Sequence, residues 1–205
     1  MKSEVKDLLR TLHDMGNDAE DCVSLLQTSF IYSSLPTLCD CQKRIRVFRE
    51  TEPRLTREVA ELARDKTGLK PFVSVPGHLM RIGESIEKLA GCVEKMVKEH
   101  ILFSDRAIEE ITYLFQRIMD ILRPMSDVIL ARNAIMAKYV GESEVGVVKQ
   151  ALEFATLHEE RLIEGVCIPY ASSLYIQMLD EIKNIAWHTK EIATKLTEGA
   201  AVEVH

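Results

Sequence analysis

The stretch RIGESIEKLA at residues 81–90 has a counterpart near the end of the chain, NIAWHTKEIA at residues 184–193. Both copies place an isoleucine second and close on an apolar residue followed by alanine. Ile82 and Leu89 are two helical turns apart, as are their counterparts in the second copy, so the members of each pair lie on one face of a helix. Because half the length of the chain separates the two copies, the phrase indicates one helical unit used twice.

Apolar residues recur at three- and four-residue steps on both sides of this phrase, and no convincing strand-like alternation occurs in the sequence. The spacing predicts six helices, whose apolar residues extend over 5–30, 38–62, 79–96, 108–135, 145–166 and 174–196. Long helices joined by short loops pack as antiparallel neighbours. The sequence therefore predicts an all-α fold in which the repeat groups the helices into two three-helix bundles packed side by side.

The two repeats divide the chain into residues 1–100 and 101–205, with the boundary near His100-Ile101-Leu102. This connector lacks the Gly, Ser and Pro content of a flexible linker. We therefore expect one continuous structural unit with a shared core and a pseudo-two-fold relation between its halves, not two independent domains.

Several residues predict where the helices begin, bend and end. Ser104 followed by Asp105 is typical of the amino-terminal cap of a helix, here the fourth. We expect Pro53 to kink the second helix or divide it in two, and Pro124 to bend the fourth. Further expected limits are Gly68 for the second helix, Gly77 before the third, Gly141 after the fourth, Pro169 after the fifth and fraying after Gly199. The apolar stripe assigned to the fifth helix is Val145, Val148, Leu152, Ala155, Leu162 and Val166.

Composition excludes several kinds of partner. A formal net charge of −6 disfavours nucleic acid and anionic lipid, since both require a basic surface. No apolar stretch is long enough to span a bilayer, so direct membrane insertion is not expected. The charged amino terminus does not resemble a signal peptide. The five cysteines are an odd number scattered over helical patterns, which favours small core residues in a reducing compartment, and we predict a cytoplasmic protein.

The repeated phrase resembles the motif of the PhoU family, Leu-Glu-Arg-Ile-Gly-Asp-His-Ala-x-Asn-Ile-Ala, and more closely the PhoU-type cytoplasmic region of sodium/phosphate cotransporters. The first copy matches at Leu79, Arg81, Ile82, Gly83 and Ala90, with Glu84 in place of Asp. The second matches at Ile185, His188, Ile192 and Ala193, with Ala186 in the Gly position. Residues 103–110 also resemble the family's usual entry into its second half.

The resemblance implies a six-helix double bundle that acts as an adaptor between a phosphate transporter and a sensor kinase and catalyses no reaction. It also implies metal ions held by carboxylates on the third helix of each unit. This chain departs from the family at those positions, where Met80, Lys183 and Trp187 stand and only Glu84 remains acidic. A lysine repels a cation and a tryptophan has no lone pair to offer one. We therefore predict that the family-type metal site is lost or reduced.

A different metal site is a second hypothesis. His13, with its acidic neighbours on the first helix, is a candidate to complete an acidic surface site with Glu84 or Glu87, and His188 is a further candidate ligand. The simpler interpretation is that these acidic residues form a solvent-exposed face of the helix and bind no metal. Cys39 and Cys41 are too close for the usual zinc spacing.

No sequence pattern supports catalysis. The chain has no Gly-x-Ser-x-Gly and no Gly-rich phosphate loop, and His158-Glu159-Glu160 lacks the second histidine of a metalloprotease helix. We therefore predict a regulatory adaptor linked to phosphate uptake that works through protein contacts and uses no cofactor. A metal-binding bundle and a structural homo-oligomer, such as a homodimer, remain alternatives. Arg44, Arg46 and Arg49 form a small basic cluster suited to an anion, to an acidic partner or simply to solvent.

Overall fold

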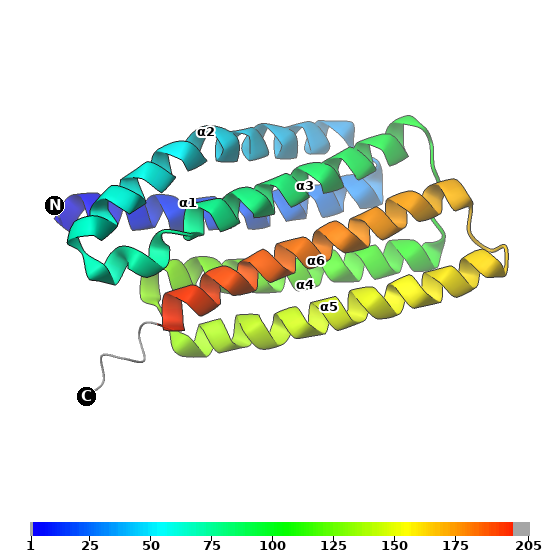
Figure 1. The fold of residues 1–205 in the computed structure, drawn as a ribbon. Helices are drawn as coiled ribbons and strands as arrows, with labels where there is room; N and C mark the ends of the chain where they lie inside the picture. Colours follow the sequence, from blue (N-terminus) through cyan, green and yellow to red (C-terminus); the bar gives the residue numbers. More distant parts are fainter. Residues whose placement is uncertain (1, 199–205) are drawn as a thin grey trace.

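A computed structural model describes residues 2–198 of the protein and shows six long helices (Figure 1). They are α1 (Lys2–Tyr32), α2 (Leu35–Asp65), α3 (Val75–Lys98), α4 (Asp105–Ala131), α5 (Ala134–Ile163) and α6 (Pro169–Glu198). A short 3-10 helix, η1 (Thr67–Phe72), joins α2 to α3. The described residues contain no strand, and the predicted all-α class is confirmed.

The helices form two bundles of three. Within α1–α3 every helix contacts the other two, and the same holds within α4–α6. The bundles lie side by side, with α1 packed against α4 and α3 against α6 (Figure 1). Each of these contacts pairs a helix with its own counterpart in the repeat, as a two-fold relation between the halves requires. In the described part of the chain, α2 and α5 contact only elements of their own bundle.

One hydrophobic core runs through both bundles. The apolar anchors of the repeated phrase lie in it: Ile82, Leu89, Ile185 and Ile192 are completely buried. Polar caps fix the starts of three helices, since the side chains of Ser34, Ser104 and Asn133 accept hydrogen bonds from the first backbone N–H groups of α2, α4 and α5. The cap predicted at Ser104 is thereby confirmed.

The second helix is continuous through Pro53, so its division into two helices was a wrong alternative. Proline removes one backbone hydrogen bond, but Phe48 before it and Leu55 and Val59 after it all lie in the core. Packing on both sides therefore holds one helix. The end predicted at Gly68 was also wrong, because α2 ends at Asp65 and residues 67–72 are 3-10.

Two helix limits differ from those predicted. The third helix begins at Val75, before Pro76 and Gly77, since proline in the first turn has no N–H to leave unbonded. The fourth does not extend to Gly141. It ends at Ala131, where Arg132 adopts a left-handed conformation with φ of 47°. Ile135, assigned to the fourth helix, lies in α5 and is 81% exposed.

The stripe assigned to the fifth helix was wrong. Val145 and Leu152 are exposed, and the buried face of α5 carries Ala137, Val140, Ser143, Glu144, Val147, Ala151, Phe154 and His158. Three of these buried residues are polar, so the spacing of the apolar residues alone predicted the wrong face of the helix to be buried. The fifth helix does end before Pro169.

No helix in residues 2–198 is long and apolar enough to cross a membrane. The fraying predicted after Gly199 falls outside the described residues.

Candidate functional site

The repeated phrase lies on the two helices that join the bundles. Its first copy is on α3 and its second on α6, and these helices pack against each other. Gly83 of the first copy lies against Phe48 of α2, and a Cβ added at this glycine would lie 3.1 Å from the Phe48 ring. Ala186, the corresponding residue of the second copy, is completely buried. The small residue in each copy thus lies where little space is left between helices.

A histidine pair bridges the two halves. His188 of α6 and His78 of α3 approach with their Nδ1 atoms 2.9 Å apart, and Lys195 Nζ lies 3.0 Å from His78 Nε2. Burial, with the neighbouring charges of His78 and Arg81, lowers the pKa of His188 to about 4. Burial and Lys195 also lower the pKa of His78. Both rings are therefore neutral near pH 7, and one donates a hydrogen bond to the other.

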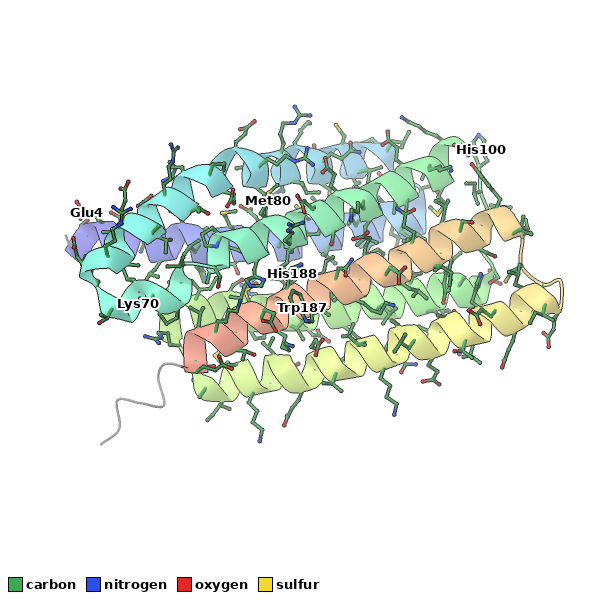
Figure 2. All side chains as sticks on the ribbon, viewed as in Figure 1. Glu4, Lys70, Met80, His100, Trp187 and His188 are labelled. Carbon is green, nitrogen blue, oxygen red and sulfur yellow. The ribbon has the colours of Figure 1, made fainter. Side chains whose placement is uncertain are left out.

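Trp187 lies beside this pair on the outer face of α6 (Figure 2). It is 45% exposed, packs its ring edge-on against His188 with centroids 4.7 Å apart, and has the Lys190 amine over its face at 5.9 Å. A half-exposed tryptophan held in a fixed orientation by its neighbours is typical of a protein contact surface.

Trp187 also lines a groove between α5 and α6. Its walls carry Glu144, Val148, Asp180, Glu181, Lys183, Asn184 and Trp187. Lys183 forms an ion pair with Asp180 at 2.8 Å, and Lys88 of α3 reaches Glu181 at 3.0 Å. Glu144 is buried in the groove wall. The charged residues in the lining give this groove a net negative charge.

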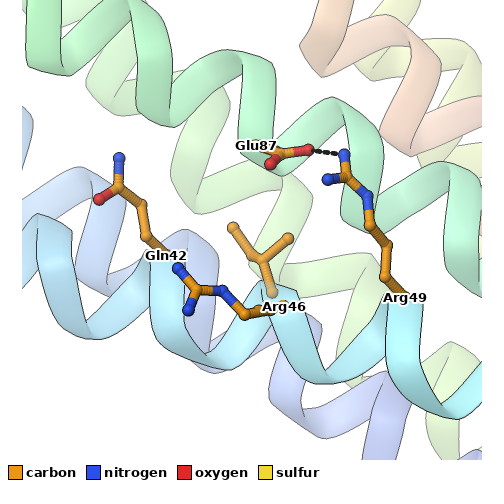
Figure 3. A pocket seen from close by; sticks show the side chains of 5 residues that line it. Gln42, Arg46, Arg49 and Glu87 are labelled. Carbon is orange, nitrogen blue, oxygen red and sulfur yellow. Dashed lines mark hydrogen bonds and ion pairs between the residues drawn. The ribbon is translucent and has the colours of Figure 1, made fainter.

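The matching groove of the first bundle, between α2 and α3, is basic (Figure 3). Gln42, Ile45, Arg46, Arg49 and Glu87 line a cavity of about 280 Å³. Glu87, a predicted metal candidate, forms an ion pair with Arg49 instead. Arg46 has no hydrogen-bond or ion-pair partner among the described residues.

The structure does not bring the predicted metal candidates together. Glu84 forms an ion pair with Arg81 at 3.3 Å, and Glu87 with Arg49. His13 of α1 lies 3.6 Å from Asp127 of α4 and 3.1 Å from Asp14. Among residues 2–198 no three His, Cys, Asp or Glu side chains are grouped so as to hold a metal ion.

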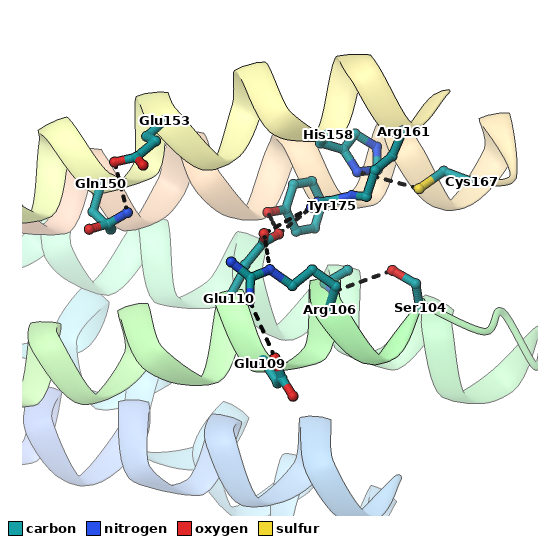
Figure 4. A network of polar contacts seen from close by, with 11 residues as sticks. Ser104, Arg106, Glu109, Glu110, Gln150, Glu153, His158, Arg161, Cys167 and Tyr175 are labelled. Atoms are coloured by element: carbon teal, nitrogen blue, oxygen red, sulfur yellow. Dashed lines mark hydrogen bonds and ion pairs between the residues drawn. The ribbon is translucent and has the colours of Figure 1, made fainter. Parts of the chain in front are cut away.

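No sequence pattern predicted the network around Glu110 of α4 (Figure 4). This carboxylate is 2% exposed and accepts two hydrogen bonds from Arg161 at 2.9 and 2.7 Å, one from Tyr175 at 2.5 Å and one from Arg106 at 3.1 Å. Burial alone raises the pKa of Glu110, but the bonds from Arg161 and Tyr175 outweigh it and leave that pKa below its ordinary value. The network ties α4, α5 and α6 together at one end of the bundle.

The described architecture matches a known structure. The crystal structure of PhoU from Pseudomonas aeruginosa superposes with a TM-score of 0.85 over 98% of this chain and 98% of that one, at 16% sequence identity. The chain has the PhoU fold.

The PhoU fold places the two copies of the phrase in equivalent positions, on the third helix of each three-helix unit. This agrees with the resemblance carried by Arg81, Ile82, Gly83, Ile185 and His188. No family model and no curated protein matches the sequence.

Proposed function

We propose that this chain is a cytoplasmic, non-enzymatic regulator of phosphate uptake that acts by binding other proteins, such as a phosphate transporter or a sensor kinase. The observation that carries the proposal is the match to PhoU over nearly the whole of both chains. The repeated motif supports it independently, because Arg81, Ile82, Gly83, Ile185 and His188 match the family motif in sequence.

The grooves and Trp187 supply surfaces for such contacts. Trp187 lies between two shallow depressions, one along α5 and α6 and one lined by Ser74, Gly77, His78 and Arg81 of the first bundle. A partner that covers Trp187 would contact both halves at once.

The family-type metal cluster does not fit the residues present. Met80 and Trp187 offer no hard oxygen ligand, Lys183 is a cation paired with Asp180, and Glu84 is paired with Arg81. We therefore propose regulation without a resident metal cluster. A homodimer that buries the Trp187 face is a second candidate, because a half-exposed tryptophan at a shallow groove also suits self-association.

Phosphate uptake in cells that lack the chain tests the proposal. Uptake of radiolabelled phosphate is measured in phosphate-rich medium and after phosphate starvation, with the wild-type chain or a variant restored. We expect loss of the chain to change the ratio of the two uptake rates, and Trp187→Ala to restore that ratio only in part.

Tyr113→Ala is the matched control, since Tyr113 is an aromatic residue of α4 that is 46% exposed. It should restore uptake fully. Equal uptake ratios with and without the chain would refute the regulatory role. Sedimentation of the purified chain at several concentrations tests the homodimer, because self-association would double the measured mass as the concentration rises.

A further inference from the structure

The basic groove between α2 and α3 has a defined geometry. Gln42, Arg46 and Arg49 are spaced four and three residues apart on α2 and line the same cavity. Gln42 and Arg49 reach toward α3, whereas Arg46 lies along α2 with its guanidinium group toward Gln42 (Figure 3). The buried side chain of Ile45 forms the floor. The cavity of about 280 Å³ is several times the ~30 Å³ that a water molecule occupies in the liquid, so it has room for a small hydrated ion.

The charges in the groove are only partly balanced. The lining contains two guanidinium groups and one carboxylate, that of Glu87, which pairs with Arg49. Arg46 is left with all its N–H groups available to solvent or ligand. The Gln42 amide is a further donor, though it is already bonded to Glu94 at 3.3 Å.

Glu87 shows what the groove can hold. Its carboxylate is an oxyanion that already contacts the guanidinium group of Arg49, and Arg46, three residues earlier on α2, lines the same cavity. Guanidinium groups bind carboxylate and phosphate oxygens through paired N–H donors.

We propose that this groove binds phosphate, free or carried on a protein side chain, between Arg46 and Arg49. The choice of phosphate among tetrahedral oxyanions rests on the proposed function, whereas the site itself rests on the geometry. Glu87 competes with the ligand for Arg49 and so keeps the affinity low. Because both arginines are exposed, binding also weakens with ionic strength.

Titration of the full chain with inorganic phosphate, followed by calorimetry at low ionic strength, tests the site. Arg46→Gln should weaken binding about tenfold, since it removes one charge-assisted contact. Glu87→Gln should strengthen it, because it frees Arg49 and removes a repelling charge. Arg64→Gln, which makes the same charge change at an exposed position further along α2, is the control and should leave the affinity unchanged.

The opposite effects of Arg46→Gln and Glu87→Gln separate a local site from general attraction to charge. Equal weakening by Arg46→Gln and Arg64→Gln would overturn the proposal, as would no binding at millimolar phosphate or weaker binding by Glu87→Gln. If the chain binds no phosphate in the titration but cells lacking the chain still show a changed uptake ratio, the proposed phosphate site is refuted and the regulatory role stands.

The source of the phosphate is resolved by a second titration. A phosphoserine peptide and its unphosphorylated form are compared with inorganic phosphate. Tighter binding of the phosphopeptide, displaced by inorganic phosphate, assigns the groove to a phosphorylated partner. Binding of inorganic phosphate alone assigns it to the free ion.

Discussion

Glu110 of α4 and Arg161 of α5 are joined by two parallel hydrogen bonds, at 2.9 and 2.7 Å, at a site where the carboxylate is almost completely buried. The two residues are distant in sequence and belong to different helices, so the pair fixes how α5 lies on α4. Arg161 has few other partners, and its Nε is buried without one.

Glu110→Ala should destabilise the fold by about 3–5 kcal/mol, because it leaves the Arg161 charge largely buried and unpaired. Urea unfolding monitored by helical circular dichroism measures the change. Glu109→Ala is the control: Glu109 is exposed, its ion pair with Arg106 is long at 3.7 Å, and its loss should cost less than about 0.5 kcal/mol. Equal costs for the two variants would contradict the assigned role of Glu110.

The histidine pair predicts a pH dependence of stability. His188 has a folded pKa of about 4 against an ordinary value of 6.5, and that of His78 is also lowered. Between pH 4 and 6.5 the unfolded chain therefore binds protons that the folded chain does not. The free energy of unfolding should therefore be fully retained above pH 6.5 and decrease as the pH falls toward 4.

His188→Gln should make this decrease shallower, since glutamine does not titrate. Urea unfolding at a series of pH values compares the two proteins. Identical slopes for wild type and variant between pH 6.5 and 4 would show that the pair does not carry the effect.

Two glycines of α3 should respond oppositely to alanine. At Gly91 an added Cβ meets nothing within 4 Å, so Gly91→Ala should stabilise the protein by up to about 1 kcal/mol through helix propensity. At Gly83 the Cβ would press on the Phe48 ring at 3.1 Å, and overpacking of about 1–3 kcal/mol should cancel or reverse that gain. Thermal unfolding of both variants decides the matter, and a gain at Gly83 equal to that at Gly91 would contradict the close packing.

The cysteines should differ in their reaction with iodoacetamide. Cys22, Cys41 and Cys92 are buried, whereas Cys39 is exposed and Cys167 partly so, and all five are free. Mass spectrometry of the native protein should find label at Cys39 and Cys167, and at all five positions only after unfolding. Rapid labelling of Cys22 in the native protein would contradict its position in the core.

Regular apolar spacing allowed most of the fold to be predicted. Helices such as α3 and α6 bury nearly every residue of their predicted stripes, including Ile82 and Ile185, so periodicity located them well. It failed on α5, where Glu144 and His158 occupy the buried face while Val145 and Leu152 are exposed. His158 stacks on the Tyr175 ring of α6, a contact between helices that the spacing of apolar residues does not show.

The candidate site was less predictable for the same reason. His188 was singled out by the repeated phrase, but its partner His78 precedes the first copy and was not singled out. In the sequence Glu110 does not differ from a solvent-exposed acid, and only the structure shows that Arg161 and Tyr175 donate hydrogen bonds to it. The metal candidates Glu84 and Glu87 both proved to have arginine partners, one of them on another helix.

Among the described elements, the bundles meet through α1 with α4 and α3 with α6, with a further contact of η1 with α6. The outer helices α2 and α5 each form one wall of a groove whose other wall is α3 or α6. The groove of the first bundle has two arginines and one glutamate in its lining, and the groove of the second has three carboxylates and one lysine. The two related three-helix bundles thus present grooves of opposite net charge on one molecule.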